Sequence, residues 1–71
     1  METINWYEMD NGTVVSKERI VSTETKEDAV FILSLLAEVN NSKIEKTDGD
    51  VSYVRINDSK GDGFYQIDKE Y

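Results

Sequence analysis

The segment from Ala29 to Val39 is apolar around almost its whole circumference when it is drawn as a helix. At about 100° per residue, the apolar side chains cover an arc of roughly 260°, interrupted by Glu27, Ser34 and Glu38. A helix that lies on one core needs an arc only slightly wider than about 100°. A small domain has too little interior to surround such a helix, so we expect part of it to contact a partner.

The chain has 71 residues, which suits a single domain over residues 1–71. Fifteen acidic residues against eight basic ones give a net charge of -7. This charge argues against direct binding to nucleic acid or to anionic membranes, because Lys and Arg supply most of the affinity for phosphate. It suits a partner protein with a basic surface, since opposite charges speed the encounter. The alternative is that this net charge simply keeps the protein soluble.

Histidine and cysteine are both absent. The chain therefore lacks the usual general base, and it has no thiolate that could act as a nucleophile or bind a metal. An enzyme built on this chain would have to use carboxylates, Lys, Tyr or Ser, and carboxylate pairs do serve this purpose in glycosidases. We therefore expect a non-enzymatic protein with no catalytic or cofactor-binding residues. The longest apolar run is shorter than the roughly 20 residues of a membrane span. No basic-then-apolar leader follows Met1, so we expect a cytoplasmic location.

The segment Asp58–Gly63 partly resembles a calcium-binding loop. Asp at positions one and five and Gly at position six match the EF-hand pattern. Lys60 and Lys69, however, stand where oxygen ligands are required. We therefore expect a polar hairpin loop and no metal site.

Hydrophobic patterning and turn residues predict strands at 3–9, 13–21, 43–47, 51–57 and 64–68, with a helix at 26–39. Asn11-Gly12 and Asp48-Gly49 are predicted to form two-residue hairpin turns. Thr25 is the expected N-cap, with Asp28 three positions later, and the asparagines after Val39 are expected to end the helix. The order ββαβββ predicts an α+β two-layer sandwich, with one helix packed on one face of an antiparallel sheet of hairpins.

The helix stripe expected to face the sheet consists of Ala29, Ile32, Leu36 and Val39. Simple two-residue turns would place Ile4 opposite Arg19, Trp6 opposite Lys17 and Ile44 opposite Tyr53. Large apolar residues then occur on both faces of the sheet. One helix cannot cover both of them.

Residues on the helix flanks and on the first strand are therefore the candidate partner or dimer interface, and they are Glu27, Phe31, Leu33, Leu35, Glu38 and Trp6. The alternative is internal packing. The strands could curl round the helix, with Phe64 and Tyr65 folded over it, and Lys17 and Arg19 could cover Trp6.

These observations favour a small acidic protein–protein interaction module. Small acidic chains without enzymatic residues are a common form of regulator or inhibitor, including those of phages and mobile elements, and one subtype blocks a nucleic-acid-binding protein. Two alternatives stay open, namely a structural homodimer and a minimal carboxylate-dependent enzyme. The sequence identifies no small-molecule ligand.

Overall fold

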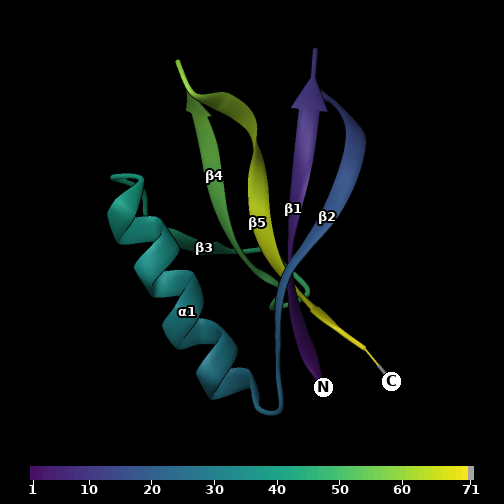
Figure 1. The fold of residues 1–71 in the computed structure, drawn as a ribbon, viewed down its shortest axis with the longest axis vertical. Helices are drawn as coiled ribbons and strands as arrows, with labels where there is room; N and C mark the ends of the chain where they lie inside the picture. The colour runs from purple at the N-terminus through teal and green to yellow at the C-terminus, as the bar shows by residue number, and fades with distance from the viewer. Residues whose placement is uncertain (71) are drawn as a thin grey trace.

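The computed structural model describes residues 1–70, which form one antiparallel sheet and one helix (Figure 1). The sheet order is β2-β1-β5-β4-β3. The elements, in chain order, are β1 (Glu2–Asp10), β2 (Thr13–Thr23), α1 (Lys26–Val39), β3 (Ile44–Lys46), β4 (Ser52–Asp58) and β5 (Gly61–Lys69). The predicted α+β two-layer sandwich is confirmed. Pairing of β1 with β5 joins the two halves of the chain at the centre of the sheet.

The helix has the predicted bounds, because polar side chains cap both of its ends. The Thr25 hydroxyl accepts a hydrogen bond from the Asp28 N–H at 3.2 Å. At the other end, Asn41 adopts a left-handed conformation with φ 54°. The Ser42 N–H then reaches the carbonyl of Ala37 at 2.8 Å. This arrangement is the Schellman C-cap, and asparagine supplies it here in place of glycine.

The β1–β2 hairpin turns at Asn11-Gly12 as predicted, with φ values of 52° and 79°. Two irregularities then shift the register, so that Ile4 pairs with Val21 and Tyr7 with Lys17. The predicted pairing of Trp6 with Lys17 is wrong, because each bulge adds an unpaired residue to β2. The hairpin end extends beyond the helix (Figure 1), and residues 13–20 are exposed.

The predicted two-residue turn at Asp48-Gly49 is also wrong. Asp50 has φ 63°, and the Thr47 N–H bonds to the Val51 carbonyl at 3.0 Å, so the loop contains one more residue. Ile44 therefore pairs with Val54 instead of Tyr53. A shift of one residue reverses the faces of a strand, and here it places Ile44 against the core.

The predicted loop at 58–63 is shorter than expected. Asp58 pairs directly with Gly61, so that β5 already begins at Gly61 and includes Asp62 and Gly63. The Lys60 N–H donates to Asp58 Oδ1 at 2.8 Å and tightens the turn. The residues that resemble a calcium loop are therefore largely strand residues.

One helix stripe and one sheet face form the core. The fully or nearly fully buried apolar residues are Ile4, Ala29, Leu33, Ala37, Val54, Ile56 and Ile67. The predicted stripe is displaced around the helix, since Val39 is 78% exposed while Leu33 is completely buried. We call Ala29, Leu33 and Ala37 the buried row. Two alanines in this row let the helix backbone lie close to the sheet, which bulkier side chains would prevent.

Candidate functional site

Three large apolar side chains of α1 lie in solvent. Phe31 is 66% exposed, Leu35 47% and Val39 78%. They are spaced four residues apart, so they lie on one side of the helix and form what we call the exposed row. The predicted Phe31–Leu35 flank is therefore an accessible surface, while the flank that contains Val30, Leu33 and Ala37 packs on the sheet.

Negative charge surrounds the exposed row. Glu27 and Glu38 are exposed on the same side of the helix, and Asp28 lies in the first turn, three residues before Phe31. The last turn contains no basic residue, so the negative end of the helix dipole is not compensated there. At the first turn, Lys26 Nζ lies 3.4 Å from Asp50 Oδ2. The helix surface therefore combines apolar side chains with an acidic rim.

Leu33 and Trp6, two other residues of the predicted interface, do not lie on this exposed side of the helix. Leu33 is 0% exposed and lies in the core, so its assignment to an exposed interface is wrong. Trp6 is half-buried on the helix side of the sheet, with its ring centroid 4.7 Å from that of Tyr65. Its indole covers Gly63, because a Cβ placed on Gly63 would lie 2.5 Å from Trp6 Cζ2. Neither Lys17 nor Arg19 pairs with Trp6, which faces Glu18 in β2.

The sheet face opposite the helix, which we call the open face, carries aromatic side chains that sequence reasoning did not bring together. Tyr7 and Phe64 stack with ring centroids 4.9 Å apart, and Tyr53 meets Phe64 edge-on at 6.5 Å. They come from β1, β5 and β4, whose order depends on long-range pairing. The available signal was the alternation of Tyr7 and Met9 in β1, which places them together on one face.

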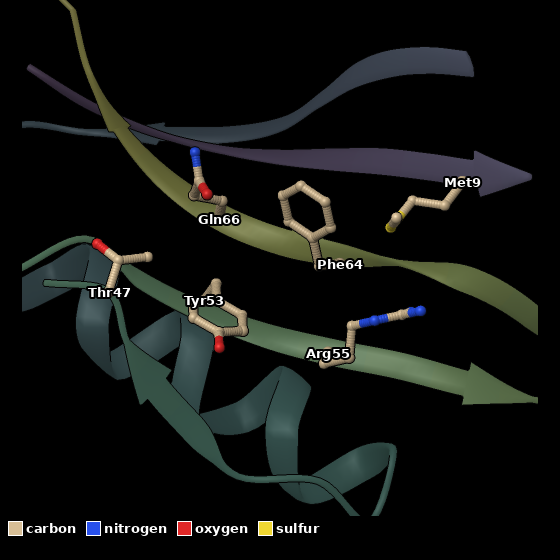
Figure 2. Close-up of a pocket in the computed structure, with 6 residues that line it drawn as sticks. All are labelled: Met9, Thr47, Tyr53, Arg55, Phe64 and Gln66. Atoms are coloured by element: carbon tan, nitrogen blue, oxygen red, sulfur yellow. The ribbon is translucent and has the colours of Figure 1, made fainter. Parts of the chain in front are cut away.

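A shallow hollow of about 310 Å³ lies on the open face. Figure 2 shows side chains of β1, β4 and β5 that lie around Phe64 on one side of the sheet. The residues that line the hollow are Met9, Thr47, Tyr53, Arg55, Phe64 and Gln66.

A hydrogen-bond network crosses β1 and β5 beside this hollow. Asp68 accepts hydrogen bonds from Asn5 Nδ2 and Gln66 Nε2, both at 2.7 Å, and from the Tyr7 hydroxyl. Burial opposes ionisation of Asp68, but these donors, with the charge of Lys17, outweigh it and lower the pKa of Asp68. Burial and the Asp68 carboxylate raise the pKa of Tyr7 to about 12. The network therefore holds a neutral phenol against an ionised carboxylate.

Metal binding has little support in the described residues. Residues 1–70 contain no cluster of three or more potential metal-ligating side chains. Asp62, which the calcium-like pattern places in a loop, instead lies 2.6 Å from Arg55 Nη2. Nor does this part of the chain include a helix with the length and apolarity of a membrane span.

Comparisons of the chain with protein families, with curated proteins and with solved structures found no match.

Proposed function

We propose that this chain is a non-enzymatic protein–protein interaction module that acts in the cytoplasm and binds a basic-surfaced protein through α1. The observation that carries the proposal is the exposed row, in which Phe31, Leu35 and Val39 are 47–78% exposed beside the acidic residues of the same helix. Large apolar side chains gathered on a protein surface often mark an interaction site.

The spacing of the exposed row suits a helix-in-groove contact. In such contacts, side chains one turn apart on a helix enter an apolar groove of the partner. Phe31 and Leu35 would be the anchors, while Glu27 and Glu38 would meet Lys or Arg at the rim of that groove. A protein that normally binds nucleic acid offers such basic side chains. A regulator or inhibitor of phage or mobile-element type is one form that this activity could take.

The same charges weigh against self-association through this surface. In a two-fold dimer the helix surface would face its own copy, so the acidic rims of two helices would be brought together. Like charges placed opposite each other across an interface oppose binding. We therefore place the structural homodimer second.

Catalysis is the weakest alternative. A general acid at neutral pH requires a carboxyl group whose pKa is raised, usually within a cleft. Here the pKa of Asp68 is lowered by its hydrogen-bond donors, and the pKa of Asp50 is lowered by Lys46 and Lys26.

The test compares three baits in lysate of the native host: the unaltered chain, a Phe31→Gln/Leu35→Gln variant and a Val15→Gln variant altered in β2, where that side chain is 57% exposed and lies outside both proposed sites. We expect one basic protein to be captured by the first and third baits and lost with the second. Repeating the capture at rising salt should weaken it, because exposed charge pairs are screened. Circular dichroism checks that each bait is folded.

Equal capture by all three baits would refute the assignment to α1. Binding that is insensitive to salt would refute the proposed contact of Glu27 and Glu38 with basic side chains of the partner. Light scattering of the purified chain supplies the last control, because a stable dimer that the helix variant dissociates would favour the homodimer.

A further inference from the structure

The hollow on the open face has properties of a binding site that are independent of α1. Its volume of about 310 Å³ lies at the lower end of the range of about 300–1,000 Å³ typical of ligand sites. It is lined by aromatic and apolar side chains with a few polar groups, the composition that such sites share. It lies on the opposite side of the sheet from the helix, as the alternation of Tyr53 with the buried Val54 requires.

The shape of the lining suits a flat ring. Phe64 stands at the centre of the hollow (Figure 2), stacked on Tyr7 and met edge-on by Tyr53. These contacts hold the Phe64 ring in one orientation. Aromatic rings bind one another in offset-stacked or edge-to-face geometry, and a partner ring entering the hollow would find both kinds of surface already arranged.

The charges around the hollow do not favour an ionic ligand. Arg55 Nη2 lies 2.6 Å from Asp62 Oδ1, and Arg55 Nη1 donates to the carbonyls of Gly63, at 2.8 Å, and Ile56. The guanidinium therefore already has partners on the β4–β5 hairpin, and the Asp62 carboxylate beside it balances its charge. A cation would meet Lys17, whose Nζ lies 5.9 Å from the centroid of the Tyr7 ring. The Asp68 carboxylate beside the hollow already accepts hydrogen bonds from Asn5, Gln66 and Tyr7.

Neutral polar groups remain to orient a ligand. The Gln66 amide donates to Asp68 Oδ1 at 2.7 Å, and its carbonyl oxygen is a hydrogen-bond acceptor. The Tyr53 hydroxyl can donate or accept. An indole N–H or a phenol O–H is the complementary group on an otherwise apolar ring.

We propose that the hollow binds an uncharged aromatic side chain, Trp or Tyr, of a partner protein. The ring would pack against Phe64 and Tyr53, and its polar atom would bond to Gln66. A protein side chain is the favoured source because the hollow is shallow and lies on an open sheet surface, across which a chain can continue. Trp and Tyr are also the most frequent anchors of protein interfaces.

The first experiment titrates the isotope-labelled full chain with N-acetyltryptophanamide and N-acetyltyrosinamide, followed by NMR. Indole-3-acetate and tryptamine serve as anionic and cationic comparators, and free indole tests the ring alone. We expect saturable shifts centred on Tyr53, Phe64 and Gln66, with both charged comparators binding at least threefold more weakly. Non-saturating shifts, equal binding of a charged comparator or shifts centred on α1 would overturn the proposal. Tighter binding of free indole than of either amide would overturn the assignment to a protein side chain.

The second experiment uses matched variants. Phe64→Leu keeps an apolar side chain but removes the ring, and we expect it to weaken binding of N-acetyltryptophanamide at least fivefold. Met9→Gln alters the rim without touching the aromatic stack and should weaken binding about twofold, which keeps the test decisive if Phe64→Leu does not fold. Leu35→Gln, on the exposed row, should leave the affinity unchanged. Unchanged binding in Met9→Gln and any folded Phe64→Leu variant would place the probe elsewhere.

Discussion

The buried row and the exposed row of α1 have the same four-residue spacing but lie in opposite environments. Ala29, Leu33 and Ala37 are 0–5% exposed, whereas Phe31, Leu35 and Val39 are 47–78% exposed. The exposed row has the larger apolar side chains. Apolarity alone therefore did not select the stripe that packs on the sheet. The small side chains allow the closest approach of the helix backbone, and the larger ones are left for other contacts.

The largest effect expected from this comparison is the difference between Leu33→Ala and Leu35→Ala. Leu33 is fully buried, so its truncation should lower the free energy of unfolding by about 2–5 kcal/mol through lost burial and a cavity. A chain of this size has only about 3–5 kcal/mol available from its core, so the variant should be largely unfolded. Leu35→Ala should cost less than about 1 kcal/mol. Circular dichroism without denaturant measures the unfolded fraction of Leu33→Ala, and urea denaturation measures the loss in Leu35→Ala. Similar losses would show that the exposed row also supports the fold.

Two glycines of β5 extend the contrast between buried and open positions to the sheet. A Cβ on Gly63 would meet Trp6 and the Tyr7 carbonyl, whereas a Cβ on Gly61 would meet nothing within 4 Å. Gly63→Ala should therefore cost about 1–3 kcal/mol, as overpacked positions do. Gly61→Ala serves as the control and should change the free energy of unfolding by less than about 0.5 kcal/mol. Thermal denaturation of both variants checks this difference, and equal melting temperatures would contradict the close packing of Trp6 on Gly63.

The Tyr7–Asp68 network predicts a pH dependence that the exposed row does not share. The pKa of Tyr7 is raised from 10.0 to about 12 in the folded chain, so the neutral phenol favours folding. This contribution should be fully present below pH 10 and lost as the pH rises from 10 towards 12. Phenolate absorbance should show one late-titrating tyrosine that is missing in Tyr7→Phe. An ordinary tyrosine titration in the folded protein would refute the network.

The effect of Asp68 on stability appears at acidic pH, and its dependence on pH has the opposite sign to that of Tyr7. Because the pKa of Asp68 is lowered in the folded state, its contribution is present above the pKa of the unfolded chain and is lost as the pH falls through the folded value. Asp68→Asn should therefore lose stability at neutral pH and show a weaker dependence on acid than the unaltered chain. Denaturation curves at several acidic pH values measure this. A parallel pH dependence in both proteins would contradict the lowered pKa.

The smallest expected effect is a gain in stability. Val39 is 78% exposed in the last helical turn, which contains no basic residue. Val39→Lys should stabilise the chain by about 0.3–1 kcal/mol through the helix dipole, while Val39→Gln controls for the loss of the apolar side chain. Denaturation at low salt measures the gain. A loss in both variants would mean that Val39 packs against the domain and that the exposed row is part of its core.

Local signals were sufficient for much of the fold. The helix at 26–39, its Thr25 cap and the left-handed turn at Asn11-Gly12 depend on neighbouring residues, and each is present as predicted. The order of strands and helix, and hence the α+β class, depends on patterning of the same kind. Exposure of Phe31 and Leu35 was also anticipated, because a helix that is apolar on most of its surface must leave some of that surface uncovered.

The remaining features depend on contacts between distant segments. Bulges in β2 and the extra loop residue Asp50 set the registers, and a shift of one residue decides which face a side chain occupies. Pairing of β1 with β5 brings Tyr7 onto Phe64, residues that lie far apart in the sequence. The sequence alone determined that this domain has more apolar surface than one helix and one sheet face can bury. Only the tertiary structure decided where that surface lies, because strand register and the close approach of the helix are properties of the assembled sheet.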